Sequence, residues 1–258
     1  MSRKMTPRRI RSGRRIDWCQ SVGFKAAPGP VVALASFPGS GNTWVRYLLQ
    51  QATGILTGSV YKDYALLKNG FPAESIVNGS VLLVKTHEFG DEARRPFQKA
   101  VVLVRDPFSS LLAEFNRRSG GHIGYASADK YRRNGGRHWR NFVYNMANDW
   151  ERMNLDWFYG FLPKRRLVVF YDQLKDHPER ELRRLLDFLR VSVSNSTLQC
   201  VMDKKEGIYK RSKRLLNFSP FDESMKQLLL EKQRIVYEVS ILPLWRQLIQ
   251  KSVIALQM

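Results

Sequence analysis

The sequence predicts a single α/β domain in which helices flank a central, mainly parallel β-sheet. Four apolar runs of strand length alternate with patterns of helical spacing along its 258 residues. These runs contain almost no polar residues, as is typical of strands buried on both faces of a parallel sheet. A turn with two glycines joins the first run to a helical pattern, which is the local order of a phosphate-binding loop. Ligand sites are expected at the carboxyl ends of the strands.

The first predicted strand covers residues 31–35 and leads into the glycine-containing turn at residues 37–42. Thr43 then opens a helical pattern in which Trp44 and Leu48 share one face. This order of strand, turn and helix directs unpaired backbone N–H groups and the positive end of a helix dipole to one point. We therefore predict a P-loop-like anion site. An ordinary connection between strand and helix is the alternative.

The turn departs from the loop of nucleoside triphosphatases in two positions. Residues 36–43 keep the second Gly and the final Thr of the Walker pattern Gly-x-x-x-x-Gly-Lys-Ser/Thr. Ser36 replaces the first Gly, and Asn42 replaces the Lys. Without the lysine that contacts the outer phosphates, triphosphate hydrolysis lacks one of its principal charges, so the pattern disfavours a kinase or an ATPase.

The second predicted strand, residues 81–84, is followed directly by Lys85 and His87. Side chains two positions apart on a strand point to the same side, so both residues can face one pocket if the strand geometry continues. A histidine considered alone is more often structural than catalytic. Its position at the carboxyl end of a strand, where open α/β sheets bind their ligands, favours a functional role.

The remaining elements follow in chain order. Residues 54–78 show no clear period and are interpreted as a long loop or an excursion towards the substrate. Trp150 and Trp157 fall on a helical pattern and are predicted to be core residues. The other expected elements are a strand at 100–104, a helix at 111–118, helical spacing at 142–161, a strand at 166–171 and an amphipathic helix at 178–189.

The net charge of +20 suggests an anionic partner, and residues 1–30 contribute only +7 of it. Nucleic acid, an anionic nucleotide with an anionic acceptor, and a merely solvated surface are the three interpretations of this charge. No nucleic-acid-binding motif accompanies it, which disfavours the first.

Residues 1–30 are expected to lack a fixed structure, and residues 31–258 are expected to form the domain. Residues 1–15 contain no apolar signal region, and polar residues interrupt 239–258 well short of a membrane span.

Cysteine and asparagine usage give two further indications. The two cysteines, Cys19 and Cys200, could pair once or stay free, and they support no metal cluster. Asn-x-Ser/Thr sequons begin at Asn78, Asn195 and Asn217, which hints at a secretory route.

Several stretches resemble sulfotransferases. SFPGSGNTW, residues 36–44, is similar to the loop that holds the 5′-phosphosulfate of 3′-phosphoadenosine 5′-phosphosulfate (PAPS). VKTHE, residues 84–88, resembles their catalytic signature, and the Arg-Asp-Pro element at 105–107 resembles the start of their 3′-phosphate site. The phrases ATGILTGS, AEFNRRSGGHIGYA, FVYNMANDW and KKEG resemble the sulfotransferase domain of the WSC-domain-containing proteins, a family linked to sulfation of sialic acid. The resemblance spans roughly residues 31–214.

The resemblance implies a role for each matching residue. His87 would be the general base, since an unperturbed pKa of about 6.5 leaves it neutral at working pH, and Lys85 would stabilise charge on the transferred sulfonate. The family's loop lysine falls on Gly39 and its 3′-phosphate serine on Ala113, so Ser109 or Ser110 is a substitute. The implied donor-binding residues are Pro38, Gly39, Ser40, Gly41, Asn42, Thr43, Trp44, Arg105, Ser109, Tyr171, Lys210, Arg211 and Ser212.

The resemblance implies a PAPS-dependent sulfotransferase that transfers a sulfonate to a hydroxyl of a glycan acceptor, with sialic acid as the acceptor sugar. No metal is expected. The family implies a Golgi location, although residues 1–30 show neither an anchor nor a signal, and a cytoplasmic location is the alternative. A non-catalytic nucleotide- or polyanion-binding protein of the same fold is the alternative function. Candidate residues for the acceptor pocket are Tyr61, Phe89, Glu114, Asn116 and Tyr125.

Overall fold

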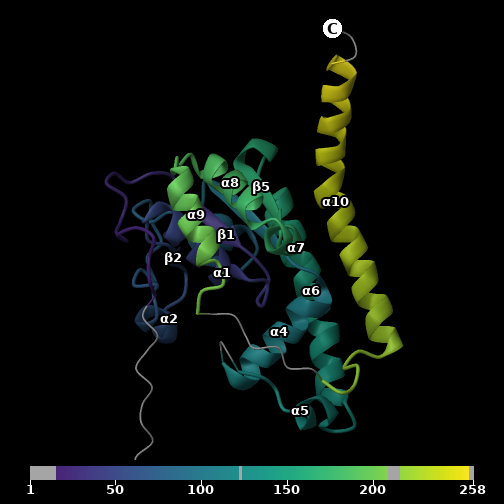
Figure 1. The fold of residues 1–258 in the computed structure, drawn as a ribbon. Helices are drawn as coiled ribbons and strands as arrows, with labels where there is room; N and C mark the ends of the chain where they lie inside the picture. Colours follow the sequence, from purple (N-terminus) through teal and green to yellow (C-terminus); the bar gives the residue numbers. More distant parts are fainter. Residues whose placement is uncertain (1–15, 122–123, 209–215, 256–258) are drawn as a thin grey trace, which may run out of the picture.

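The computed structural model describes residues 16–121, 124–208 and 216–255 (Figure 1). Its centre is a five-stranded sheet in the order β2-β3-β1-β4-β5, and every neighbouring pair is parallel. The strands are β1 (Val32–Ala35), β2 (Gly58–Ser59), β3 (Val84–Thr86), β4 (Lys99–Val104) and β5 (Arg166–Phe170). The predicted α/β domain with a central parallel sheet is confirmed.

Helices cover both faces of this sheet. The shorter helices are α2 (Tyr64–Lys68), α3 (Asp91–Arg94), α5 (Ala128–Arg132) and α7 (Tyr171–Asp176), with a 3-10 turn at Pro163–Arg165. The longer ones are α1 (Asn42–Thr53), α4 (Pro107–Gly120), α6 (Arg137–Tyr159), α8 (Pro178–Leu189), α9 (Asn195–Asp203) and α10 (Glu223–Ala255). In Figure 1, α10 runs alongside α6, and these two helices are in contact.

The alternation of side chains along the strands divides the core into two layers. In β1, Ala33 and Ala35 pack with residues of α4, α6 and α10, whereas Val32 and Leu34 pack with residues of α1, α8 and α9. Both layers are apolar because each face of a parallel sheet is covered by helices. The expected core positions Trp150 and Trp157 lie in the first layer and are fully buried.

The sequence located most elements to within a few residues. The helix expected at 178–189 coincides with α8, and the strands expected at 31–35, 100–104 and 166–171 differ from β1, β4 and β5 by one residue at an end. The second strand was placed too early. Residues 81–83 are buried, yet the pairing with β1 and β2 involves only β3, which begins at Val84.

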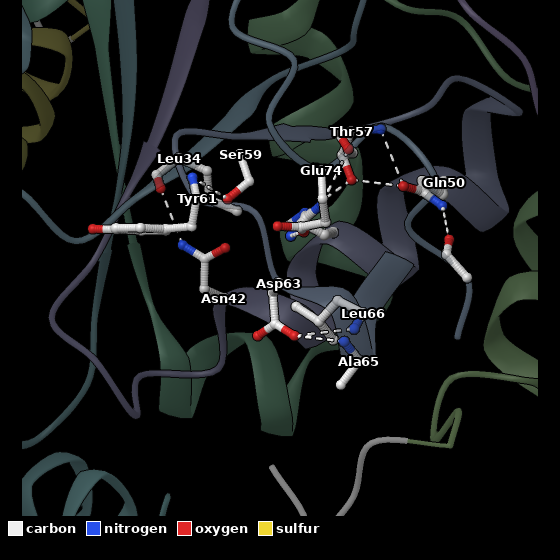
Figure 2. Close-up of polar contacts among 12 residues, drawn as sticks. Leu34, Asn42, Gln50, Thr57, Ser59, Tyr61, Asp63, Ala65, Leu66 and Glu74 are labelled. Carbon is white, nitrogen blue, oxygen red and sulfur yellow. Dashed lines mark hydrogen bonds and ion pairs between the residues drawn. The ribbon is translucent and has the colours of Figure 1, made fainter. Parts of the chain in front are cut away.

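The stretch at residues 54–78, interpreted as a long loop or an excursion towards the substrate, contains two short elements that were not expected, β2 and α2. The side chain of Asp63 caps α2 by accepting hydrogen bonds from the N–H groups of Ala65 and Leu66 (Figure 2). Such a cap supplies acceptors for N–H groups that have none within the helix. A two-residue strand and a five-residue helix are too short to produce a periodic pattern.

Residues 16–30 lie against the domain rather than apart from it. Cys19 forms a disulfide with Cys200, and Gly23 forms a parallel bridge with Ile55. The folded unit therefore extends N-terminal of the expected boundary at residue 31. A disulfide that closes a loop of 181 residues stabilises the fold by about 5 kcal/mol in the chain-entropy model.

A buried ion pair fixes the part of α1 that faces β2. Arg46 and Glu74 form this pair with fully buried side chains, and Arg46 also donates to the hydroxyl and the carbonyl of Thr57. Glu74 and Thr57 converge in Figure 2. Breaking such a pair leaves one buried charge without compensation, which typically costs about 3–5 kcal/mol.

Among the helices of the described residues, none combines the length and the apolar character that a membrane span needs.

Candidate functional site

The turn between β1 and α1 forms a tight loop around the first residue of the helix. Gly39 and Gly41 have φ angles of +85° and +95°, in the left-handed region that glycine adopts at little cost. A side chain at Gly41 would also collide with the ring of Tyr171, since a Cβ there would lie 2.7 Å from it. Glycine at position 41 therefore allows an aromatic ring to cover the loop.

The loop presents a set of amide groups that lack acceptors among the residues that the structure describes. Over the described residues, the N–H groups of Gly39, Gly41, Asn42 and Thr43 make no hydrogen bond, whereas that of Ser40 donates to the carbonyl of Phe37. These groups lie at the N-terminus of the twelve-residue helix α1. Unpaired amides and the positive end of the helix dipole attract an anion, and the phosphate group of a nucleotide fits this arrangement.

The side chain of Asn42, which occupies the Walker lysine position, stabilises the loop itself. Its amide donates to the carbonyl of Leu34 at 3.0 Å and to the hydroxyl of Ser36 at 3.1 Å, and Figure 2 shows it pointing towards Leu34. The amide therefore ties the start of α1 back to β1. The backbone N–H of Asn42, rather than its side-chain amide, is therefore the donor that this residue offers to an anion.

Helix α4 packs directly on the loop and explains the glycine at the family's lysine position. A Cβ at Gly39 would lie 2.5 Å from the carbonyl oxygen of Ser110 and 3.1 Å from the Cβ of Ala113. No side chain fits there while α4 keeps its place, so a lysine at this position is excluded. Small residues in the loop and in the facing part of α4, here Gly39 and Ala113, are needed for this close approach.

Arg105 and Ser110 connect the start of α4 to the loop. Arg105 donates to the carbonyl of Gly39 at 2.8 Å, and the hydroxyl of Ser110 lies 3.4 Å from that of Ser40. Ser109 is half-buried, and its backbone N–H donates to Asp106 in the cap of α4. Of the two serines that the sequence offered, Ser110 rather than Ser109 therefore contacts the loop.

Aromatic side chains surround the same edge of the loop. The guanidinium of Arg105 lies 4.3 Å from the ring centre of Tyr171, and the rings of Tyr171 and Trp44 meet edge to face at 5.8 Å. A purine base stacks well on such surfaces. Lys210, Arg211 and Ser212, the other expected contacts of the nucleotide, lie outside the described residues.

The His87 imidazole is attached to the other side of the loop. Its Nδ1 donates to the carbonyl of Ser36 at 2.7 Å, because a carbonyl can only accept, and Nε2 is therefore left as the acceptor nitrogen. Tyr61 stacks on the imidazole at 5.7 Å and accepts a hydrogen bond from the backbone N–H of His87. This contact orients the ring, and the sequence offered Tyr61 only as a lining residue.

The side chains of Lys85 and His87 both lie beside the ring of Tyr61. The ammonium of Lys85 is 5.6 Å from the centre of the Tyr61 ring on which His87 stacks, and the Lys85 residue is 7% exposed. Burial lowers the pKa of Lys85 to about 8. Burial and the adjacent charge of Lys85 lower the pKa of His87 to about 3, far from the ordinary value that the sequence analysis used.

Glu114 and the arginines that follow it were not recognised from the sequence as a charged cluster. The carboxylate of Glu114 is fully buried and accepts hydrogen bonds from Arg117 at 2.6 and 2.7 Å and from Arg118 at 2.7 Å. Spacings of three and four residues on a predicted helix were the available signal. The charge of Arg117 contributes to the lowered pKa values of Lys85 and His87.

The other proposed pocket residues have different surroundings. Asn116 accepts hydrogen bonds from the N–H of Ala126 and the hydroxyl of Tyr131, so its amide supports the chain after α4. The hydroxyl of Tyr125 is buried, and Phe89 lies 5.3 Å below the guanidinium of Arg152. Of the five, Tyr61 has its ring against both His87 and Lys85.

Some known proteins are similar to this chain in sequence, and others are similar to it in fold. The model of the Sulfotransferase family matches residues 93–195. WSCD family member CG9164 of Drosophila melanogaster is 59% identical over 217 residues, which are 84% of this chain and 68% of the relative. The chain belongs to the WSCD family. WSCD family member GA21586 of Drosophila pseudoobscura pseudoobscura is 57% identical over 219 residues, covering 85% of this chain and 69% of the relative.

The fold of this WSCD family member is that of the sulfotransferases. The crystal structure of mouse sulfotransferase SULT7A1 complexed with PAP superposes with a TM-score of 0.56 at 15% identity, covering 87% of this chain and 90% of that chain. The expected resemblance to sulfotransferases is borne out by the family match over residues 93–195 and by the fold.

The hydrogen bond and the buried surroundings of His87 predict an imidazole that stays neutral. In NMR spectra of the folded protein, the ring resonances of His87 should not titrate between pH 5 and pH 8, and they should show the proton on Nδ1. Replacing Lys85 with Met removes an adjacent charge and should raise the pKa of His87. Because the folded state takes up this proton less readily than the unfolded state, the site should lower stability as the pH falls below about 6.5. A transition near pH 6.5 in the folded protein would contradict this assignment.

Proposed function

We propose that this WSCD family member is a sulfotransferase that binds PAPS on the loop at residues 36–43 and transfers the sulfonate to a hydroxyl of an anionic glycan. PAPS supplies the sulfonyl group. The observation that carries the proposal is the hydrogen bond from the His87 imidazole to Ser36, the first residue of the loop whose amides at residues 39 and 41–43 make no hydrogen bond within the described residues. The mouse relative in fold is described as a complex with PAP, which is adenosine 3′,5′-bisphosphate.

The loop amides and the residues around Arg105 fit the two phosphates of the donor. The N–H groups of Gly39, Gly41, Asn42 and Thr43 would hold the 5′-phosphate. Arg105 has a buried Nε that makes no hydrogen bond within the described residues, and a guanidinium suits phosphate because it donates to two oxygens at once. Arg105, Ser109 or Ser110 would hold the 3′-phosphate, together with Lys210, Arg211 and Ser212. Trp44 and Tyr171 would stack with the base.

In this proposal His87 and Lys85 act on the acceptor. The hydroxyl oxygen forms a bond to sulfur while the bond between sulfur and the phosphate oxygen breaks. The hydroxyl proton passes to Nε2 of His87, which is the nitrogen left unprotonated by the hydrogen bond to Ser36. With a pKa of about 3, His87 accepts a proton only as the hydroxyl becomes acidic during bond formation. Lys85, a cation at neutral pH, stabilises negative charge on the transferred group.

Two arginines support an anionic acceptor, and we propose sialic acid as the acceptor sugar. Glu114 holds Arg117 and Arg118, whose side chains remain 45% and 51% exposed. Arg118 turns towards α6, where it donates to the sulfur of Met146. Arg117 is instead coupled electrostatically to Tyr61, Lys85 and His87. Its exposed part is therefore placed to bind a carboxylate of the acceptor.

We also propose that the enzyme works in the Golgi lumen. The disulfide between Cys19 and Cys200 is expected in an oxidising compartment. The sequon residues Asn78, Asn195 and Asn217 are all exposed, as glycosylation requires. Colocalisation of the tagged protein with a Golgi marker tests this location, and a diffuse cytoplasmic signal would overturn it.

Loss of either reacting side chain should slow transfer strongly while donor binding persists. His87→Ala should lower kcat by about 10²–10⁴-fold, as for other general bases, and Lys85→Ala should lower kcat in the same direction. Calorimetry with PAP should show that His87→Ala still binds. His138→Ala, which changes an exposed histidine at the start of α6, is the matched control and should keep full activity.

The wild-type pH profile tests the role of Lys85. The lowered pKa means that Lys85 is charged below pH 8 and neutral above it, so kcat/KM should fall as the pH rises through about 8. Lys85→Arg keeps its charge and should lack this fall.

Transfer that is unchanged in both His87→Ala and Lys85→Ala would reject the mechanism. PAP binding without any transfer by the wild type would favour the alternative, a non-catalytic nucleotide-binding protein.

Arg117→Ala tests the anionic acceptor. This change should raise KM for a sialylated glycan by about 10–100-fold, which corresponds to the loss of a charge-assisted hydrogen bond, and should leave PAP affinity unchanged. Arg118→Ala is the matched control. It also removes one arginine that is bonded to Glu114, but this arginine faces α6. Equal effects of the two variants, or no preference for sialylated over desialylated acceptors, would contradict the role given to Arg117.

A further inference from the structure

The disulfide joins two segments that both contact the helix of the donor loop. Cys19 lies in the N-terminal strap, which we define as residues 16–20, and Cys200 lies in α9. Their Cα atoms are 6.0 Å apart although 181 residues separate them in the chain. The last turn of α9 leads into Lys204 and Lys205, where the basic run of residues 204–214 begins.

The strap is bonded to the side of α1 through a buried glutamine. Gln51 accepts a hydrogen bond from the backbone N–H of Cys19 at 2.6 Å and donates to the carbonyl of Asp17 at 3.1 Å. The same amide group donates to the hydroxyl of Tyr47 at 2.9 Å. Gln51 is fully buried, so each lost bond would leave a polar group without a partner.

The chain after α9 is bonded to the same face of α1. The hydroxyl of Tyr47 donates to the carbonyl of Lys204 at 2.8 Å, and the indole of Trp44 donates to the carbonyl of Lys205 at 2.7 Å. The ammonium of Lys204 pairs with Asp17 of the strap at 2.6 Å. The strap, α1 and the end of α9 thus form a closed network, and the disulfide is its covalent member.

This network ends at the donor loop. Trp44 follows the loop amides by one residue and packs edge to face on Tyr171, whose ring covers Gly41. The position of the indole depends on the carbonyl of Lys205, and the position of that carbonyl depends on where α9 is held. A change at Cys200 can therefore reach the nucleotide site through packed, hydrogen-bonded groups.

We propose that the Cys19–Cys200 disulfide positions Trp44 and the start of the basic run for the donor nucleotide, so that tight nucleotide binding requires the oxidised enzyme. This inference rests on the proposed function, because it assumes that adenosine nucleotides bind at the loop. The disulfide acts through Trp44 and touches no reacting atom, so it is a positioning element. Its loss should weaken binding of PAP and raise KM for PAPS while kcat stays close to its original value.

The redox chemistry is simple thiol–disulfide exchange. In dithiothreitol the two thiols of the reagent become a cyclic disulfide, and Cys19 and Cys200 each gain one electron and one proton. Both cysteines are half-buried, so the reagent can reach the bond during local opening. Reduction releases the strap from α9 while the hydrogen bonds of Gln51 and Tyr47 can persist. The expected loss of PAP affinity is about 2–30-fold, the range typical of coupling carried by a network.

Calorimetry with PAP tests the proposal on four forms of the full chain. These are the oxidised wild type, the wild type in dithiothreitol, the Cys19→Ser/Cys200→Ser double variant and Tyr47→Phe. The double variant and the reduced enzyme should show the same weakened binding. Tyr47→Phe keeps the disulfide but removes the hydroxyl that links Gln51 to Lys204, and it should weaken binding in the same direction. Added to the double variant, Tyr47→Phe should cost less than it does alone, because both changes break one network.

Val143→Ala separates this effect from a general loss of stability. Val143 is buried in α6 in the opposite core layer, so the variant should lower Tm and leave PAP affinity unchanged. If the oxidised wild type binds PAP and the double variant and reduced enzyme bind equally well, the inference is wrong while the proposed function stands. If Val143→Ala loses PAP affinity to the same extent as the double variant, the effect is general and the inference is likewise wrong. If the oxidised wild type does not bind PAP, the proposed function itself fails.

Discussion

The register between β1 and β3 is the constraint on which the site depends. Ala35 pairs with Thr86, so the next residues, Ser36 and His87, leave the sheet side by side. The N–H of Ser36 donates to the carbonyl of Thr86, and the imidazole of His87 returns a hydrogen bond to the carbonyl of Ser36. A shift by one residue would turn the side chains to opposite faces. Apolar packing on both faces of the sheet therefore fixes the distance between the glycine loop and the His87 imidazole.

The close contact between the loop and α4 decides how charge is distributed. Because Gly39 lies against the backbone of Ser110, no cation can stand at this loop position. Positive charge comes instead from Arg105 at the start of α4, from Lys85 on β3 and from Arg117 near the end of α4. These cations come from the two ends of α4 and from β3. Electrostatic stabilisation by preorganised charges depends on their positions, so a different origin of the cation is compatible with the same chemistry.

The sequence predicted what depends on local pattern, and it failed where distant segments meet. Apolar runs located β1, β4 and β5, and the spacing of leucines located α8, because burial of a face leaves a period in the sequence. The convergence of Lys85 with His87 followed from strand geometry alone. The pairing of Cys19 with Cys200 could not be predicted, since it depends on the strap lying beside α9. The pKa of His87 depends on burial and on the charge of Lys85, and neither effect can be read from the amino-acid sequence. The bonds of Asn42 to Leu34 and Ser36 likewise become clear only in three dimensions.

In the proposed site, one end of the sheet holds the donor phosphate on the loop and the base beside it. A crystal structure of the oxidised protein with PAP measures this arrangement directly. We expect the 5′-phosphate to lie within hydrogen-bond distance of the N–H groups of Gly41, Asn42 and Thr43, with Nε2 of His87 open to the side where an acceptor would approach. A nucleotide bound elsewhere, or an imidazole that has turned its Nε2 away from the loop, would contradict it.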